Sequence, residues 1–335
     1  MTNPNSNVRT LVIGGAGAIG SNLVRRLAAD GYRVAVFTLP GPDLIRMDQL
    51  KNQIEIIIGD LTVSDEIRQA IERIQPQIVY HLASSVWARV PGIGQQDHLK
   101  VSGLGTLYLM EALKDKPGTR VVFTGTAAVY GPGEHFKEDA PIIPNTVFGA
   151  CKAAASTLLQ TYGRISGLST VELRFFMPYG PWEHPHRLIP QTILSVLEKR
   201  DLPMTSGEQK RDLVYIDDVV EALVLAGTKQ VKSGSIFNIG SGHAIPVKNI
   251  VKEIFTLMQS PRTPLLGRIP MRQDEIMTMS ADITAARKAL DWEPRVTLTE
   301  GLKKTIAWWE QNRQFAEHML AETATASPPA SAPQN

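Results

Sequence analysis

The sequence has a single cysteine, almost no net charge and no long apolar run, and each absence excludes a class of protein. Cys151 has no second thiol to pair with, so an internal disulfide is impossible. A formal charge of +2 provides no overall field toward nucleic acid or membrane. No apolar run is long enough to span a bilayer, and the first residues lack the apolar core of a signal peptide. We expect a cytoplasmic protein with no nucleic-acid, membrane or metal partner.

The first half of the chain alternates between apolar, β-branched segments and segments with helical periodicity. Strands are expected at 9–15, 32–38, 53–60, 77–83, 119–126 and 169–176, and helices at 21–31, 64–74, 103–114 and 148–165. Strands that are apolar throughout are typical of a parallel sheet covered by helices on both faces. We therefore predict an α/β fold with a Rossmann-type doubly wound parallel sheet.

The second half changes character. Helices expected at 187–200, 246–258 and 299–314 are set among short strands such as 235–240. This pattern indicates a smaller C-terminal α/β lobe that binds substrate. The expected division is a dinucleotide-binding core over 1–175, a mainly substrate-binding lobe over 176–318 from which some segments return to the core, and a disordered tail, rich in Ala, Ser and Pro, over 319–335.

A glycine-rich loop joins the first strand to the first helix. Gly14 permits a tight turn, Gly17 lets the backbone approach a pyrophosphate, and Gly20 lets the helix pack closely on the sheet. The helix N-terminus adds amide donors and a positive dipole end. A turn without a ligand is the alternative, but the strand–loop–helix context favours dinucleotide binding. The expected contacts in this loop are Gly14, Gly17, Ala18, Ile19 and Gly20.

Further cofactor contacts are expected where other strands end at the same sheet edge. Asp60, followed by Leu61, could meet the adenine or simply cap a helix, and Ala83 leaves room for phosphate or ribose. Thr38 ends the second strand, where an acidic residue would favour NAD and a following arginine NADP. Thr38 is neutral and only Arg46 could reach a 2′-phosphate, so the cofactor is NAD or NADP.

Nine segments in this order and spacing resemble the extended short-chain dehydrogenase/reductase family, in its nucleotide-sugar epimerase, dehydratase and reductase branch. They are GGAGAIGS, GDLTVSD, YHLAS, TGTAAVYG, FGACK, ELRFFMPYGP, QKRDLVYIDDVVEAL, RQDE and ALDWEPRVTLTEGLKKTIAWW. The resemblance runs from about residue 8 to residue 310. It implies a nicotinamide bound over the sheet, a nucleotide-sugar substrate in the second lobe, and a homodimer formed through a helix bundle that includes residues 148–165.

The resemblance also implies roles for individual residues. Thr126 occupies the position of the hydroxyl that holds the sugar oxygen, and Lys152 that of the lysine that grips the nicotinamide ribose. Arg211 and Arg272 match positions that clamp the substrate diphosphate, with a structural salt bridge of Arg211 to Asp212 or Asp217 as the alternative. Arg187 and Met177 complete the expected substrate-binding set, although Met177 and Ser102 stand where asparagine is usual.

The sequence departs from the family at the catalytic tyrosine, whose position is taken by Phe148. Phenylalanine keeps the ring but cannot donate or accept a proton, a loss worth roughly two to four orders of magnitude in rate. Another group could act instead, the chemistry could need only a weak acid, or the protein could bind without catalysing. The candidate substitutes are Thr124, Thr126, Tyr130, Cys151, Glu183, His184 and His186.

The residues after Thr126 narrow the reaction. Dehydratases of this branch carry an acidic pair there, whereas this chain has Ala127 and Ala128, which cannot transfer protons. We therefore expect NAD(P)-dependent epimerisation or 4-keto reduction of a nucleotide-linked hexose by hydride transfer. The alternatives are a catalytically silent protein that binds cofactor and sugar nucleotide, and a reductase of a substrate that is not nucleotide-linked.

Overall fold

The main sheet has seven strands, all parallel, in the order β3-β2-β1-β4-β5-β6-β9. The computed structural model describes residues 5–84, 94–272 and 275–325. The strands are β1 (Arg9–Ile13), β2 (Arg33–Thr38), β3 (Glu55–Ile58), β4 (Ile78–His81), β5 (Arg120–Thr126), β6 (Ser169–Phe175) and β9 (Ser235–Ile239). The strand order reverses between β1 and β4. In doubly wound sheets, ligands bind at such a reversal, outside the carboxyl ends of the strands.

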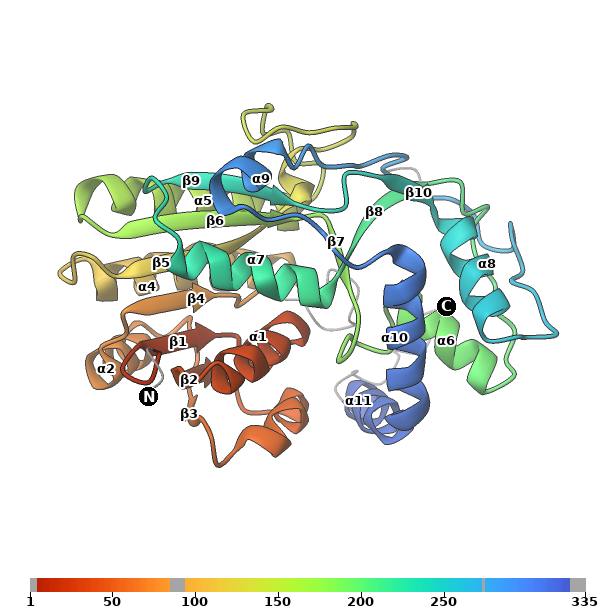
Figure 1. Ribbon diagram of the computed structural model, residues 1–335, viewed down its shortest axis with the longest axis horizontal. Coiled ribbons are helices and arrows are strands. Elements are labelled where there is room, and N and C mark those ends of the chain that lie inside the picture. The colour runs from red at the N-terminus through yellow and green to blue at the C-terminus, as the bar shows by residue number, and fades with distance from the viewer. Residues whose placement is uncertain (1–4, 85–93, 273–274, 326–335) are drawn as a thin grey trace, which may run out of the picture.

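Helices cover both faces of this sheet, because side chains alternate along each strand and both sets are apolar. In β1, Leu11 and Ile13 belong to the core formed with α2 (Ser64–Ile74), α4 (Gly105–Leu113) and α5 (Val147–Ile165). Val12 belongs to the core on the other face, with α1 (Ala18–Ala29) and α7 (Ile216–Thr228), which lie together in front of the sheet in Figure 1. The predicted fold class is confirmed.

A second sheet, of three strands, forms the centre of the smaller lobe. Its strand β8 (Lys210–Tyr215) pairs in parallel with β7 (Met177–Tyr179) and antiparallel with β10 (Ala244–Pro246). Near it, at the right of Figure 1, lie α6 (Leu188–Leu197), α8 (Val247–Leu257) and α10 (Leu298–Gln311). Three later segments return to the main sheet: α7, β9 and α9 (Thr284–Leu290). The predicted strand at 235–240 is therefore not part of the small lobe, because β9 pairs with β6 at the edge of the main sheet.

Besides α9, periodicity did not indicate several shorter or terminal helical segments. They are η1 (Pro42–Leu50), α3 (Gln95–His98), the π-helix η2 (Leu99–Leu104), η3 (Ala127–Val129) and α11 (Arg313–Thr325). α11 packs against η1 through a face that buries Phe315, Ala316 and Met319. The helix continues past residue 319, where the tail was expected to begin, and the rest of that predicted tail lies outside the described residues. Within the described ranges, no helix combines the length and apolarity needed to cross a membrane.

Asp212 ties β8 of the small lobe to two neighbouring turns. Its buried carboxylate accepts hydrogen bonds from the Ser241 amide at 2.5 Å and hydroxyl at 2.7 Å, from the Gly242 amide at 3.1 Å and from the Ala281 amide at 2.9 Å. Burial raises the pKa of this carboxyl, and the hydrogen bonds act in the opposite direction. The carboxylate therefore satisfies backbone groups that are otherwise enclosed.

Replacing Asp212 with alanine should destabilise the protein strongly. Three backbone N–H groups would lose their acceptor, and each buried unsatisfied donor costs about 1–3 kcal/mol, so we expect the free energy of unfolding to fall by about 3 kcal/mol or more. The control is Asp217→Ala, which removes only an exposed pair with Lys304 at 3.4 Å and should cost less than about 1 kcal/mol. Urea unfolding of both variants gives the comparison, and equal losses would contradict the assignment.

Candidate functional site

The glycine-rich loop forms a cradle at the strand-order reversal. Gly14 has φ of +78°, and a Cβ there would lie 2.8 Å from the Ala83 amide nitrogen after β4. A Cβ on Gly20 would lie 2.4 Å from the Gly14 carbonyl oxygen, and one on Gly17 would lie 3.3 Å from the same oxygen. Only glycine therefore lets the loop, the start of α1 and β4 approach so closely.

The N-terminus of α1 is left open by its sequence. Gly17 occupies the N-cap position, no side chain caps it, and the first turn contains no acidic residue. Ala18, Ile19 and Gly20 follow, with Ala18 and Ile19 only partly buried. The backbone amides of such a terminus attract an anion. The loop thus fits a dinucleotide pyrophosphate, although the individual contacts predicted there stay predictions.

The other predicted cofactor residues end neighbouring strands. Thr38 is the last residue of β2, while Asp60 and Ala83 follow β3 and β4; all three lie at the same sheet edge and are partly buried. Asp60 accepts hydrogen bonds from the Thr62 amide and hydroxyl, both at 2.8 Å, so one oxygen already stabilises the turn before α2. Leu61 is buried in the core beneath Gly105, which leaves mainly its backbone for a ligand.

Arg46 does not reach toward a 2′-phosphate, contrary to the possibility the sequence left open. Its guanidinium is buried, forms an ion pair with Asp43 and donates to the Trp182 carbonyl at 3.0 Å and the Ala16 carbonyl at 3.5 Å. It also lies over the Phe315 ring, 5.0 Å from the centroid. These contacts make Arg46 a link between η1, the glycine loop and α11.

Lys152 of α5 enters the floor of the site at the end of β5. Its ammonium donates to the Thr124 carbonyl at 3.0 Å and lies 4.8 Å from the centroid of the Phe123 ring. The side chain is buried, and desolvation lowers the pKa of Lys152 to about 8, an effect that the charge of Glu172 opposes. Lys152 is thus a structured part of the site and not a solvated helix lysine.

A network of polar side chains lies behind Lys152. Glu172 of β6 pairs with Arg174 at 3.0 Å and accepts a hydrogen bond from Ser156, one turn after Lys152 on α5. Arg174 donates to the Tyr130 hydroxyl at 2.8 Å, and that hydroxyl donates to Asn238 of β9 at 2.8 Å. All five side chains are buried. The network connects the site lysine to the strands β6 and β9.

His81, at the end of β4, is a second buried polar group near Lys152. Its Nε2 lies 2.9 Å from the Thr106 hydroxyl, and its Nδ1 has no hydrogen-bond partner among the described residues. Burial, and next the charge of Lys152, lowers the pKa of His81 to about 3, so the imidazole is neutral at physiological pH. Sequence reasoning did not single out this residue.

The two remaining predicted catalytic positions start new turns. Thr126 ends β5, and its hydroxyl accepts a hydrogen bond from the Ala128 amide at 3.2 Å, so Thr126 does cap its turn. Phe148 lies in the first turn of α5 and is partly buried. Its ring lies edge-on to the imidazole of His98, with ring centroids 5.6 Å apart. His98 was missed in the sequence, although it stands four residues before Ser102, a position already singled out.

The structure places the proposed substitutes for the missing hydroxyl in different environments. The Tyr130 hydroxyl is already part of the buried network, and burial raises the pKa of the Cys151 thiol. Glu183 pairs with Arg187 at 3.1 Å, and burial raises the pKa of its carboxyl. Burial also lowers the pKa of His184 to about 4, while His186 is exposed.

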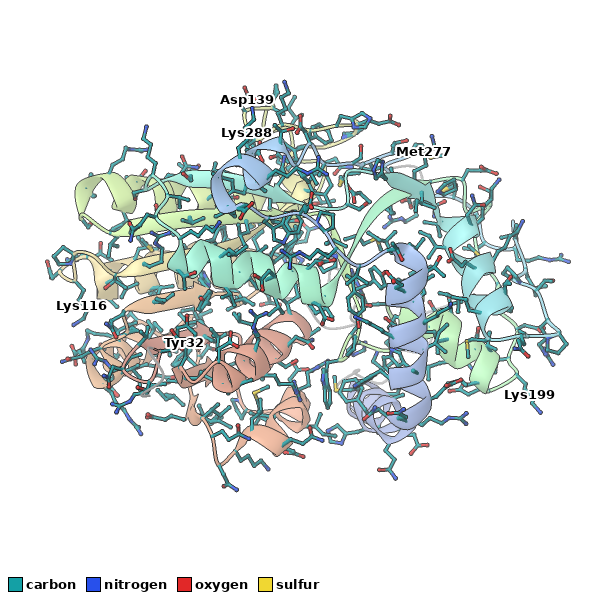
Figure 2. The ribbon with its side chains drawn as sticks, viewed as in Figure 1. Tyr32, Lys116, Asp139, Lys199, Met277 and Lys288 are labelled. Carbon is teal, nitrogen blue, oxygen red and sulfur yellow. The ribbon has the colours of Figure 1, made fainter. Side chains whose placement is uncertain are left out.

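Two predicted substrate arginines converge on one carboxylate. Arg211 of β8 forms an ion pair with one oxygen of Glu275, and Arg272 donates to the other oxygen at 3.0 and 3.2 Å. Arg211 also donates to the Ile276 carbonyl at 2.7 Å. Figure 2 marks the place by Met277, beside β10. Asp212 and Asp217 were the alternative partners expected for Arg211. Asp212 instead accepts hydrogen bonds from Ser241, and Asp217 pairs with Lys304.

The other two predicted substrate residues, Met177 and Arg187, lie at the start of the smaller lobe. Met177 begins β7, separated from the end of β6 by Phe176 alone, and is partly buried. Arg187 is the N-cap residue of α6, preceded by the loop that holds Glu183. Their roles as ligand contacts stay predictions.

The close approach at Gly14 yields a matched test. Gly14→Ala and Gly118→Ala both place a side chain at a positive φ, +78° and +83°, which costs about 1–2 kcal/mol. Gly118 has nothing within 4 Å of its Cβ position, whereas Gly14 faces the Ala83 backbone. We expect similar losses from the backbone conformation but a rise of at least about tenfold in the NAD dissociation constant for Gly14→Ala alone, measured by calorimetry. Equal affinities in the two variants would contradict a cofactor cradle.

The burial of Lys152 predicts a pH-dependent stability. Below pH 8 its amine is charged in both folded and unfolded states, and the cost of burying the charge is fully present. Between about pH 8 and 10.5 the unfolded state binds more protons, so the stability of the protein rises with pH. Lys152→Met should therefore raise the free energy of unfolding at pH 7 by about 3 kcal/mol, with a gain that shrinks across this window.

The control for this prediction is Lys288→Met, on the exposed surface of α9 (Figure 2), which should change stability little at any pH. Urea unfolding at pH 7, 8, 9 and 10 measures the gain. The same Lys152 variant should bind NAD more weakly. A gain in stability that is independent of pH would show that the ammonium is not the group responsible.

Comparison with known proteins gives the chain a family. It is 29% identical over 324 residues to UDP-glucose 4-epimerase of Mycolicibacterium smegmatis, covering 92% of this chain and 100% of that one. UDP-glucose 4-epimerase of Thermotoga maritima, solved with UDP-glucose, superposes with a TM-score of 0.85 at 27% identity, covering 91% and 99%. A dTDP-glucose 4,6-dehydratase of Streptomyces venezuelae, solved with NAD, gives 0.84 at 26%, covering 93% and 100%. Residues 10–240 match the model of the NAD dependent epimerase/dehydratase family, and the chain belongs to that family.

Proposed function

We propose that this protein epimerises or reduces a nucleotide-linked hexose, with NAD as the hydride carrier and C4 of the sugar as the reacting carbon. The observation that carries the proposal is the convergence of Arg211 and Arg272 on Glu275. Two guanidiniums from separate segments meet at one anionic group, which is the arrangement that recognises phosphate oxygens through bidentate hydrogen bonds. Glu275 would have to yield these contacts to a diphosphate.

The cofactor fits the residues present. The cradle of Gly14, Gly17 and Gly20 accepts a close backbone approach, and the uncapped start of α1 provides amides for the pyrophosphate. When bound, NAD accepts or returns a hydride at its nicotinamide ring. NAD is favoured over NADP because Arg46 is buried against Asp43 and no longer available to pair with a 2′-phosphate.

The protein's own residues would hold the sugar and order its hydroxyl. The Thr126 hydroxyl, at the end of β5, would bind the sugar oxygen. The Lys152 ammonium, fixed on the Thr124 carbonyl, would bind the nicotinamide ribose and favour negative charge nearby. Ala127 and Ala128, in η3, have no acidic group to remove a hydroxyl or a proton. Dehydration, the activity named for several relatives, is therefore not proposed for this chain.

Two alternatives keep specific support. Phe148, without a hydroxyl, favours a catalytically silent protein that binds cofactor and sugar nucleotide. Met177, at a position where the family resemblance implies an amide, favours a reductase whose substrate is not nucleotide-linked. The affinity for a free nucleoside diphosphate distinguishes the two alternatives. The catalytically silent protein would bind a nucleoside diphosphate, whereas the reductase of a substrate that is not nucleotide-linked would not.

The assembly and location proposed here also follow the family resemblance. α5 would contribute to a homodimer, and the exposed apolar residues Val147 and Ile165 at its two ends are consistent with a buried interface. A cytoplasmic location fits the single cysteine. We also propose the division into a dinucleotide-binding core over 1–175 and a mainly substrate-binding lobe over 176–318, from which some segments return to the core.

The test is turnover, followed by NMR, of a panel of nucleotide hexoses and their 4-keto derivatives with NAD or NADH. Binding of a nucleoside diphosphate is measured in parallel. Arg272→Met should raise its dissociation constant about ten- to a hundredfold, as expected for lost charge-assisted hydrogen bonds. The control is Arg262→Met, whose exposed pair with Asp201 at 2.7 Å lies in another segment. Binding without turnover would favour the silent protein, and binding that is insensitive to Arg272→Met would contradict the diphosphate site.

A further inference from the structure

His98 lies against the ring of Phe148, the residue that stands at the position of the family tyrosine. Its imidazole lies edge-on to Phe148, with centroids 5.6 Å apart and an angle of 69° between the ring planes. α3 packs against α5 and brings the two rings together. His98 is only 3% exposed, so this contact is part of the interior and not of a mobile surface. The phenyl ring that replaces a tyrosine is thus in contact with an ionisable ring.

The backbone after His98 has an unusual form. Residues Leu99–Leu104 make a π-helix, η2, between α3 and α4. π-helical turns are rare and frequently lie at functional sites, where they shift side chains out of the ordinary helical register. η2 packs against α5, as α3 does, so the widened turn faces the helix that holds Phe148 and Lys152.

His98 also begins a row of buried polar side chains. Ser102 follows four residues later and Thr106 four residues after that, and all three are buried. The Thr106 hydroxyl lies 2.9 Å from His81 Nε2, while the Ser102 hydroxyl has no hydrogen-bond partner among the described residues. An unpaired buried hydroxyl is costly unless water or a ligand completes it. Buried polar side chains therefore follow His98 along this segment, and one of them, Thr106, contacts His81.

We propose that His98 is the catalytic acid/base of this protein and replaces the hydroxyl that Phe148 lacks. The inference rests on the proposed function. In the oxidative step, the C4–H bond of the sugar breaks and its electron pair leaves as hydride to NAD. The O4–H bond breaks, its proton passes to an imidazole nitrogen of His98, and its electron pair forms the C4=O bond. In the reductive step the proton returns from His98 to O4 as hydride returns to C4.

The other groups near Phe148 fit this role less well. The Lys152 ammonium is directed to the Thr124 carbonyl, and the Tyr130 hydroxyl is held between Arg174 and Asn238. The Thr126 hydroxyl is a poor acid and base at neutral pH. Imidazole alone among them combines an N–H donor with a second nitrogen that can accept a proton and later return it.

The test compares five variants, one of them Phe148→Tyr alone, with the wild type in the nucleotide-hexose assay. His98→Gln and His98→Asn should lower kcat by about 10²- to 10⁴-fold, with the affinities for NAD and nucleoside diphosphate unchanged. His135→Asn is the control. It replaces an exposed histidine at a φ of +52°, a conformation that asparagine tolerates, and should leave kcat unchanged. In the double variant His98→Gln/Phe148→Tyr, the restored hydroxyl should recover kcat to at least about a hundredth of that of the wild type.

The outcomes separate this inference from the proposed function. If His98→Gln retains the wild-type kcat, or loses binding as much as turnover, His98 is not the acid/base. If the wild type does not turn over but Phe148→Tyr does, the inference is overturned while the proposed substrate and cofactor stand. If neither turns over and neither binds a nucleoside diphosphate, both the inference and the proposed function are wrong.

Discussion

The site depends on the burial of one ammonium group. Lys152 is enclosed between β5 and α5, and desolvation alone would make its charge unfavourable. The Thr124 carbonyl, the face of Phe123 and the charge of Glu172 compensate in part. Glu172 is in turn held by the buried side chains of Arg174 and Ser156, so the charge that favours the ammonium has a fixed position. A charge that is already in position can stabilise the charge that develops on a bound substrate without any rearrangement of the protein.

A second buried cation, Arg46, joins the cofactor region to the smaller lobe. Its guanidinium donates to the carbonyls of Ala16 in the glycine loop and Trp182 in the loop before α6. Phe315 of α11 covers it, and Arg25 of α1 donates to its carbonyl while lying over Trp182. The loop that would hold the pyrophosphate and the loop that leads to Arg187 are therefore held by the same side chain. A displacement of one loop would therefore displace the other, because the close-packed interior has little free volume.

Much of the fold and part of the site could be predicted from the sequence. Strands that are apolar on both faces, and glycines at the first turn, have local causes, so β1 to β6 and the cradle at Gly14 followed from neighbouring residues. The partners of Arg211 and the site role of His98 did not. Glu275 lies 64 residues from Arg211, and the contact between His98 and Phe148 depends on how α3 packs against α5. Arg46 was misjudged for the same reason, since its burial depends on α11, which periodicity did not reveal.

Phenylalanine at position 148 removes a proton-transferring hydroxyl from the site but keeps the aromatic ring in place. Gly149 allows α5 to approach η3 so closely that a Cβ there would lie 2.4 Å from the Ala128 carbonyl oxygen. The first turn of α5 is thus fixed beside Thr126 whichever aromatic residue precedes Gly149. A hydroxyl added to Phe148 would therefore be held on the same rigid ring. Because Lys152 remains buried at a cost in stability, the positive charge that would favour proton removal from a sugar hydroxyl remains in place, and what the site lacks is a proton acceptor that another ring can supply.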